Sequence, residues 1–282
     1  MSEGNPAPLA AAIQMASGPN VSANLIEADR LLKEAADAGA VLAVLPENFA
    51  MLGRRDEERL REAEPDGEGP LQDWLAQRAR QYGLWIVGGT IPLQVDQERC
   101  AGSCLVYDDQ GERRGRFDKM HLFDVTLPES GDLYHESAST RPGDQVVVLD
   151  SPVGRLGIAV CYDLRFPELF RAMSARGAEV FAVPSAFTRQ TGRAHWELLN
   201  RARAVENLAW VIAGAQGGYH VEGRETWGHS MIVDPWGQVV AEKDQGAGVV
   251  TSPISLEKNA SLRRRFPVLE HRRNDLWPLA AD

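Results

Sequence analysis

The stretch RLGIAVCYDLRFPELFRAMSARGAEVFAVP, residues 155–184, decides the fold class of this chain. It starts with the apolar run 155–160, which predicts a strand, and it ends with a second strand-like run at 179–184. Between them, the segment from Pro167 to Ala175 predicts a helix, because proline suits the first helical turn. Strands that alternate with helices in this way predict an α/β protein whose helices pack on sheet faces.

The same alternation begins near the N-terminus. Residues 9–15, LAAAIQM, predict a first strand, and Asn20 is expected to cap the helix that follows. Gly39 ends that helix, and the all-apolar run 41–45 predicts a strand buried on both faces. The helix itself is indicated by apolar residues at helical spacing, namely Leu25, Ala28, Leu31, Leu32 and Ala35.

The rest of the chain continues this pattern. Residues 229–243 predict a hairpin that turns at 234–237, because proline fixes φ and glycine tolerates a positive φ. The charged segment 54–69 is expected to be an excursion on the surface. No linker divides the chain, so we expect one domain over residues 1–282. The other predicted elements are helices at 70–82 and 193–207 and strands within 83–91, 103–108 and 209–216.

Composition excludes several classes of protein. The 282 residues include 30 Lys and Arg against 40 Asp and Glu, a formal net charge of −10, which argues against a nucleic-acid partner. No apolar run reaches the roughly 18 residues that a membrane span needs. The first ten residues lack a secretory signal, and three cysteines do not make a disulfide framework. We therefore expect a cytoplasmic protein with free thiols and no membrane segment.

Cys161 is the first candidate for chemistry. It follows a predicted strand directly and precedes a predicted helix. Backbone N–H groups and a helix N-terminus at such a turn lower the pKa of a thiol and favour the nucleophilic thiolate. The alternative is a small hydrophobic residue at a strand end. Position alone leaves both interpretations open.

Glu47 and Lys119 are the next candidates. Glu47 follows a predicted buried strand at the sheet edge where α/β proteins bind ligands, so it is a candidate general base. A carboxylate at a helix N-terminus is the alternative. Lys119 lies among aromatic and apolar neighbours and could stabilise an oxyanion, whereas a surface lysine is the plainer interpretation.

Other chemistries have weaker support. Cys161 could pair with His121 or His195, but neither histidine is singled out by its spacing. Cys100 and Cys104 could form half of a metal site, yet no second thiolate or histidine pair completes it. The glycine-rich motifs of dinucleotide and phosphate sites are missing from the sequence. We therefore expect no metal and no nucleotide cofactor.

Three strings together resemble the nitrilase superfamily of carbon–nitrogen hydrolases. They are LPENF around Glu47, DKMHLFD around Lys119 and CYDLRFPELFR around Cys161, and the resemblance extends over residues 9–277. It implies an α/β fold of the four-layer α-β-β-α sandwich type. It also implies a Glu–Lys–Cys site that uses no metal and no organic cofactor.

The resemblance assigns a role to each residue of that site. Cys161 attacks an amide carbonyl, Glu47 takes the thiol proton and later activates water, and a thioester forms between the two steps. Lys119 and the backbone N–H of Tyr162 hold the oxyanion. Glu136, in the string YHES, matches a second carboxylate that orients Lys119 and the water.

Longer strings resemble one branch of the superfamily. These are HLFDV at 121–125, residues 184–207, AGAQGGYH at 213–220 and GHSMIVDPWG at 228–237. That branch cleaves glutathione whose γ-glutamyl amino group has become a ketone, and it releases 2-oxoglutarate and cysteinylglycine. The alternatives are an ω-amidase acting on 2-oxoglutaramate, a broader short-chain amidase and, least favoured, a binding scaffold without turnover.

The substrate carboxylate requires a cation in the site. Arg165 is the best candidate, since guanidinium binds a carboxylate with two hydrogen bonds, although an ion pair with Glu168 or Asp163 is the alternative. By resemblance, Phe187 and Thr188 line the pocket, while Phe187 could instead be plain core. The role of His195 stays open.

The resemblance also implies a homodimer. Helices at 166–175 and 202–211 would form the contact, and the tail at about 255–282 could lie at the interface. The segment 54–69 follows Glu47 closely, which suggests a lid over the pocket as a hypothesis.

Overall fold

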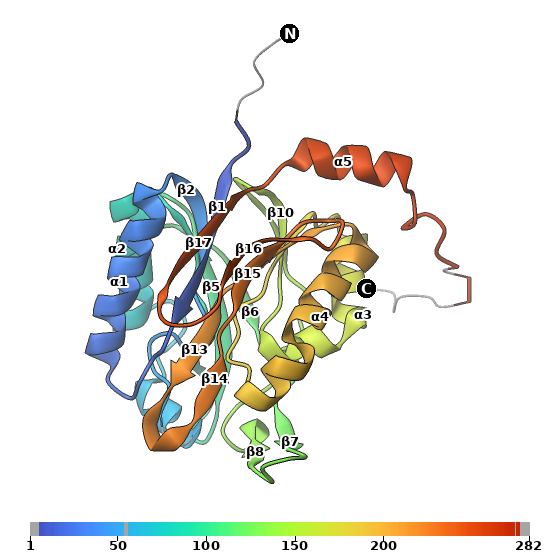
Figure 1. The fold of residues 1–282 in the computed structure, drawn as a ribbon. Helices are drawn as coiled ribbons and strands as arrows, with labels where there is room; N and C mark the ends of the chain where they lie inside the picture. The colour runs from blue at the N-terminus through green and yellow to red at the C-terminus, as the bar shows by residue number, and fades with distance from the viewer. Residues whose placement is uncertain (1–5, 54–55, 274, 277–282) are drawn as a thin grey trace.

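Two β-sheets pack face to face, and helices cover the outer face of each sheet (Figure 1). This computed structural model describes residues 6–53, 56–273 and 275–276. Helices α1 and α2 contact the first sheet, and α3 and α4 contact the second. The architecture is therefore the predicted four-layer α-β-β-α sandwich.

Within the described residues the first sheet has nine strands, in the order β14-β13-β1-β2-β3-β5-β4, with β17 paired to β1 and β6 to β5. Its strands are β1 (Leu9–Met15), β2 (Ala40–Val44), β3 (Trp85–Val87), β4 (Ile91–Gln94), β5 (Cys100–Tyr107), β6 (Arg113–Asp118), β13 (Ala215–Tyr219), β14 (Glu225–Trp227) and β17 (Gly248–Pro253).

The second sheet, counted over the same residues, has six strands in the order β16-β15-β12-β11-β10-β9. They are β9 (Val148–Ser151), β10 (Gly154–Ile158), β11 (Val180–Ala182), β12 (Trp210–Ala213), β15 (Ser230–Val233) and β16 (Val239–Lys243). A separate hairpin joins β7 (Asp124–Thr126) and β8 (Leu133–His135).

The helices confirm most of the predicted boundaries. Those at 70–82 and 167–175 match to the residue, and the one expected at 193–207 begins four residues earlier. The described helices are α1 (Val21–Asp37), α2 (Pro70–Tyr82), α3 (Pro167–Ala175), α4 (Arg189–Asn207) and α5 (Leu256–Arg265), with 3₁₀ turns η1 (Asp56–Glu62), η2 (Glu136–Ala138), η3 (Cys161–Arg165) and η4 (Val221–Gly223).

Strand β1 contributes side chains to two hydrophobic cores. Ala10 and Ala12 face the core between the sheets, whereas Ala11 and Ile13 face the core beneath α1 and α2. Because successive side chains of a strand point to opposite faces, an all-apolar strand fills two cores at once. Asn20 caps α1 as predicted, with its side chain accepting the Ala23 N–H at 3.0 Å.

The parallel strands bring the candidate residues to one edge. Strands β1, β2 and β3 are parallel in the first sheet, and β10, β11 and β12 are parallel in the second. Glu47 follows the carboxyl end of β2, and Cys161 follows that of β10. The carboxyl ends of parallel strands are where such sheets bind ligands.

Two predicted strands are wrong in one respect, since each is broken at glycine. The run 209–216 divides into β12 of the second sheet and β13 of the first, so the chain changes sheets at Gly214. A Cβ at Gly214 would lie 2.4 Å from the Val44 carbonyl oxygen, so only glycine allows this crossing. The run 83–91 breaks at Gly89, whose φ is +56°.

The prediction of a surface excursion at 54–69 is also wrong in part. Arg59 and Glu64 are buried. Glu64 accepts the backbone N–H groups of Leu71 and Gln72, at 2.5 and 3.2 Å, and so satisfies the start of α2. Two charged side chains of this segment therefore make buried contacts, which the composition of the segment does not predict. Residues 54–55 lie outside the described residues.

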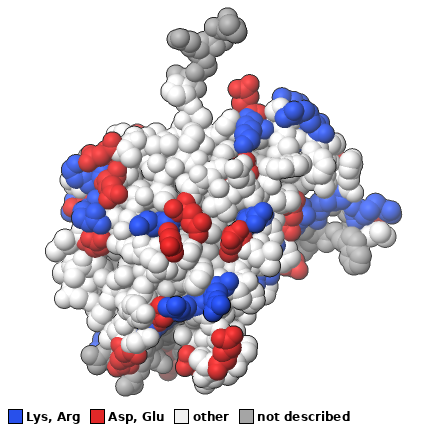
Figure 2. Space-filling view, in the orientation of Figure 1, with Lys and Arg blue, Asp and Glu red and all other residues white. Residues whose placement is uncertain are grey.

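Figure 2 shows acidic and basic side chains interspersed on the visible face, without a broad surface of one sign. Among the described residues, no helix has the length and apolar character needed to cross a membrane.

Candidate active site

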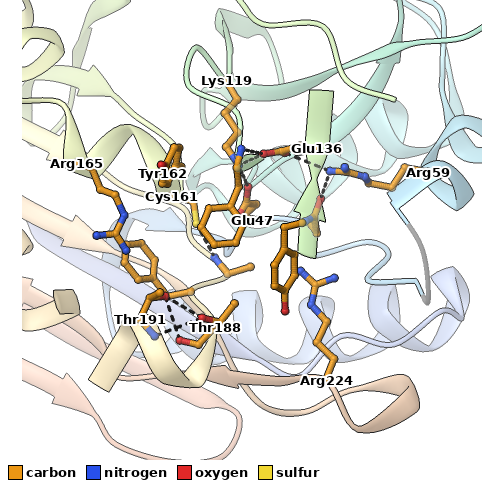
Figure 3. Close-up of a pocket in the computed structure, with 15 residues that line it drawn as sticks. Glu47, Arg59, Lys119, Glu136, Cys161, Tyr162, Arg165, Thr188, Thr191 and Arg224 are labelled. Atoms are coloured by element: carbon orange, nitrogen blue, oxygen red, sulfur yellow. Dashed lines mark hydrogen bonds and ion pairs between the residues drawn. The ribbon is translucent and has the colours of Figure 1, made fainter. Parts of the chain in front are cut away.

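Cys161 lies on a strained turn between β10 and α3. Its φ is +49°, a left-handed conformation that non-glycine residues adopt rarely and at a cost of about 1–3 kcal/mol. Its N–H donates to the Pro184 carbonyl at 2.9 Å, and the Ala186 N–H donates to its Sγ at 3.5 Å. These bonds hold the thiol at the end of the strand and point it into the pocket (Figure 3).

Lys119 joins the two candidate carboxylates. Its Nζ lies 2.8 Å from Glu47 Oε1 and 2.7 Å from Glu136 Oε2 (Figure 3). All three side chains are buried, with Lys119 only 3% exposed. Burial of charge requires pairing, and here one ammonium lies between two carboxylates. The surface-lysine interpretation of Lys119 is therefore wrong.

The charges around the thiol decide its resting form. Burial and the adjacent Glu47 carboxylate raise the pKa of Cys161 well above its ordinary value, although Lys119 opposes them. Burial disfavours the ammonium, but Glu136 and Glu47 outweigh it and raise the pKa of Lys119. Burial also opposes ionisation of Glu136, but Lys119 and Arg59 lower its pKa. Burial and Glu47 together outweigh Lys119, so the site favours the neutral thiol over the thiolate that the strand-to-helix turn suggests.

The backbone around Glu47 is held from both sides. The Glu47 carbonyl accepts a hydrogen bond from Gln216 Nε2 at 3.1 Å. The next residue, Asn48, has φ +56° and donates its N–H to Thr90 Oγ1 at 2.9 Å. Gln216 also bonds in both directions with Ser17, at 2.8 and 2.9 Å. Strands β1, β2 and β13 therefore fix the carboxylate together.

Asp163 links the lysine loop to the nucleophile turn, a role that sequence reasoning missed. Its Oδ2 accepts the Val160 N–H at 2.9 Å, and its Oδ1 accepts the His121 N–H at 2.9 Å. The same Oδ1 lies 2.6 Å from His121 Nδ1. A fully buried carboxylate with three partners holds two loops that come from different sheets.

Neither histidine considered as a partner of Cys161 bonds to it within the described chain. The ring of His121 is held by Asp163 and stacks on Phe166, with centroids 3.7 Å apart. His195 Nδ1 lies 3.1 Å from the Arg165 guanidinium, which is consistent with a positioning role. The thiol–imidazole interpretation therefore has no geometry to support it.

The pocket around Cys161 has about 490 Å³ of empty space including its mouth. Tyr162, Arg165, Phe187 and Thr188 line it, as predicted. The Arg165 guanidinium lies over the Phe187 and Tyr162 rings, 5.3 and 5.6 Å from their centroids. Among the described residues it makes no ion pair with Glu168 or Asp163, so it faces the pocket as a cation.

Seven lining residues were not predicted, namely Asn48, Arg59, Phe123, Tyr134, Ala186, Thr191 and Arg224. Arg59 lies 3.7 Å from Glu136 Oε1, and its guanidinium bonds to Thr140 Oγ1 at 3.4 Å. Its segment is charged throughout, so no local signal distinguishes this arginine. The Arg224 guanidinium lies 5.7 Å from the centroid of the Tyr134 ring. The positions of Arg59 and Arg224 in the pocket both depend on contacts between segments that are distant in the sequence.

Among the described residues no group of three His, Cys, Asp or Glu side chains is placed to hold a metal ion. Cys100 and Cys104 are buried in β5, and neither forms a disulfide with a described residue. The arrangement at Cys161 instead provides a nucleophile, a carboxylate to accept its proton and an ammonium for developing negative charge. These parts define a class of hydrolase that works through a covalent thioester.

Comparison with known proteins agrees with this class. The carbon–nitrogen hydrolase family matches residues 9–264. The deaminated glutathione amidase of Yersinia enterocolitica is 41% identical over 276 residues, 96% of each chain. The human deaminated glutathione amidase is 43% identical over 275 residues, which cover 96% of this chain and 84% of that one.

A solved structure has the same fold. Nit3 of Saccharomyces cerevisiae, a member of branch 10 of the nitrilase superfamily, superposes with a TM-score of 0.85 at 29% identity and covers 95% of this chain and 97% of that one. This chain belongs to the carbon–nitrogen hydrolase family, within the nitrilase superfamily. It is a hydrolase that acts on the C–N bonds of small amides.

Proposed function

We propose that Cys161 is the nucleophile of this amidase and that Glu47 is its general base. The observation that carries the proposal is the Lys119 ammonium held 2.8 and 2.7 Å from Glu47 and Glu136 in the pocket of Cys161. Because the thiol is neutral at rest, its proton must leave as sulfur attacks. Glu47 is the adjacent carboxylate that can accept it.

The reaction then proceeds in two halves. Sulfur attacks the amide carbonyl carbon while the thiol proton moves to Glu47, and Lys119 with the Tyr162 N–H stabilises the oxyanion. The C–N bond breaks as Glu47 returns the proton to the leaving nitrogen, which leaves a thioester. Glu47 next deprotonates water, which attacks the thioester and restores the thiol. Glu136 keeps Lys119 oriented throughout.

The substrate we propose is deaminated glutathione, which yields 2-oxoglutarate and cysteinylglycine. Two relatives of that name at 41% and 43% identity support it. The 2-oxo acid end carries a carboxylate, and Arg165 is the cation proposed to bind it. That guanidinium lies over the Phe187 and Tyr162 rings and 3.1 Å from His195 Nδ1, contacts that support a position set before substrate binds.

An ω-amidase acting on 2-oxoglutaramate is the second candidate. Its substrate has the same acyl half, so Arg165 and the same four site residues would serve it. The two functions differ only in the leaving group, which is cysteinylglycine in one case and ammonia in the other.

A 2-oxoglutarate release assay on both substrates tests the proposal, with Cys161→Ala as the control for background. Faster release from deaminated glutathione, abolished by the substitution, is the expected result. Faster release from 2-oxoglutaramate would instead assign the ω-amidase function. No release from either would overturn both assignments.

We also propose that the chain is a homodimer joined through α3 and α4. On α4, Leu198 and Val205 lie seven residues apart and are 67% and 46% exposed, which is unusual for large apolar side chains on one helix face. Light scattering should give twice the mass of the 31.0 kDa chain, and a mass near 31.0 kDa would exclude the dimer. The tail at about 255–282 is proposed to join that interface; residues 274 and 277–282 of it lie outside the described residues.

The chain is proposed to form one hydrolase domain, because side chains from both sheets fill the core that lies between them. A cytoplasmic location fits three cysteines that form no disulfide among the described residues, since thiols persist in a reducing compartment. We propose that segment 54–69 forms part of the pocket wall and not only a lid over it, since Arg59 of this segment lines the pocket.

A further inference from the structure

An outer vestibule adjoins the catalytic pocket. Its walls are the β7–β8 hairpin, the first turns of α4 and residues 223–225. It shares Tyr134, Thr188 and Arg224 with the pocket, but it does not include Arg165. In Figure 3, Arg165 and Arg224 lie on opposite sides of Cys161. The vestibule therefore opens from the side of the site that is remote from the proposed acyl-end cation.

The arginines of this vestibule differ in their surroundings. Arg189 is held in an ion pair by Glu225, and Arg224 lies over the Tyr134 ring. Arg193 is exposed on the second turn of α4 and makes no ion pair or hydrogen bond with any described residue. The remaining carboxylates, Glu129 and Asp132, lie on the facing hairpin. The α4 wall thus presents an uncompensated cation.

The proposed substrate has a charge at each end. One carboxylate belongs to the 2-oxo acid, and the other ends the cysteinylglycine that leaves. Two residues separate the scissile nitrogen from that second carboxylate, a reach of at most about 7 Å. One cation cannot bind both ends, whereas Arg165 in the pocket and the arginines of the adjoining vestibule together can.

We infer that the vestibule binds the terminal carboxylate of the leaving peptide, with Arg224 at its inner end and Arg193 on its outer wall. This inference rests on the proposed function, because it names the binding site for one half of that substrate. The vestibule would favour deaminated glutathione over 2-oxoglutaramate, since 2-oxoglutaramate has no second carboxylate to bind there and lacks this binding energy.

The test uses three substrates: deaminated glutathione, the same compound with a carboxamide at its C-terminus, and 2-oxoglutaramate. The carboxamide removes one charge and leaves the scissile amide unchanged. The ratio of kcat/KM for the acid to that for the carboxamide therefore measures recognition of the terminal charge alone. Wild-type protein is expected to favour the acid about tenfold, as for one exposed charge-assisted contact.

Three variants and a control complete the design. Arg193→Ala and Arg224→Gln should each lower the acid-to-carboxamide ratio about threefold or more, and Arg193→Glu should bring it below one. Arg30→Ala removes an exposed arginine of α1 on the other outer layer and should keep the wild-type ratio. The wild-type ratio should also fall as salt is raised, because exposed charges are screened.

Two results would overturn the inference. One is a wild-type ratio near one, and the other is an equal loss on acid and carboxamide in Arg193→Ala. Both require that deaminated glutathione is hydrolysed, so they leave the proposed function standing. Failure of the proposed function is a different observation, since no 2-oxoglutarate would then be released from deaminated glutathione or its carboxamide.

Discussion

The floor of the pocket and its outer walls are built by opposite means. On the floor, Lys119, Glu47 and Glu136 are buried and bonded to one another at 2.7 to 2.8 Å. On the walls, Arg165 is half-buried and contacts two aromatic rings and His195, whereas Arg193 is exposed and makes no ion pair or hydrogen bond with any described residue. The floor has every charge compensated before substrate binds, and the walls keep cations available.

This difference follows from the two tasks. Chemistry requires charges preorganised in a dry site, because fixed dipoles and ions there need no rearrangement during reaction. Recognition of a carboxylate requires a cation that has no internal partner, and that cation must remain near water until substrate arrives. Substitutions on the floor should therefore change kcat and stability, while those on the walls should change KM.

The largest expected effect is that of Cys161→Ala. Removal of the nucleophile eliminates the thioester route and should lower kcat by about 10⁴-fold or more. The free energy of unfolding should change little, because the substitution removes no ion pair and alanine keeps the Cβ that strains this left-handed turn. Steady-state assay and urea unfolding measure the two quantities. Residual activity within a hundredfold of wild type would contradict the assignment.

Lys119→Met should have the next largest effect. Loss of the oxyanion contact should lower kcat about 10³-fold, and the unpaired carboxylates should cost about 3–5 kcal/mol of stability. The variant's Glu136 loses its nearest cation, so its pKa should rise above the unfolded value. A carboxyl group with a raised folded pKa loses stability as pH rises.

Urea unfolding of Lys119→Met and wild type at pH 5 and pH 8 checks whether the variant loses stability as pH rises. In the wild type the Lys119 pKa is raised and the Glu136 pKa is lowered, so both contributions persist between about pH 5 and pH 10. The difference between the two proteins should therefore be larger at pH 8. An equal difference at both pH values would show that the carboxylates do not depend on Lys119.

Asp163→Asn should have an intermediate effect on the floor. An amide cannot accept all three hydrogen bonds, so the lysine loop and the nucleophile turn lose their common partner. We expect kcat to fall about 30-fold with little change in KM, and stability to fall by about 2 kcal/mol. His121→Ala is the matched variant, because it keeps the carboxylate and removes one partner; it should lose less activity. The reverse order would exclude Asp163 as the link.

The smallest expected effect is that of Arg165→Gln on the wall. KM for either 2-oxo substrate should rise about tenfold, with kcat within about threefold of wild type. Simple amides without a carboxylate should be hydrolysed equally well by variant and wild type. A large loss of kcat would place Arg165 with the floor and remove the distinction between the two regions.

Sequence reasoning succeeded where one segment carries the whole signal. Glu47, Lys119, Glu136 and Cys161 lie in distinctive strings, and the structure brings all four together in one pocket. The helix at 167–175 was predicted to the residue because its proline and apolar spacing are local. Such features can be predicted because they depend on residues that are neighbours in the sequence.

It failed where a role depends on contacts between distant segments. Arg59 reaches Glu136 across 77 positions of the chain, counting 136 − 59, and nothing near it signals burial. The division of 209–216 between two sheets depends on the approach of Gly214 to Val44. The raised pKa of the Cys161 thiol depends on its burial and on the charges of Glu47 and Lys119, which come from two other loops. Each of these exists only after the layers have packed.

The crossing at Gly214 has a consequence for the way activity emerges during folding. Glu47 and Lys119 follow strands of the first sheet, while Cys161 follows a strand of the second. Neither sheet can hold the complete site alone, and the close approach of Gly214 to Val44 joins segments that are far apart in the sequence. Contacts of this kind form late because chain entropy must be lost before they are made. A refolding chain should therefore recover its secondary structure first and its enzymatic activity last, when the two sheets dock.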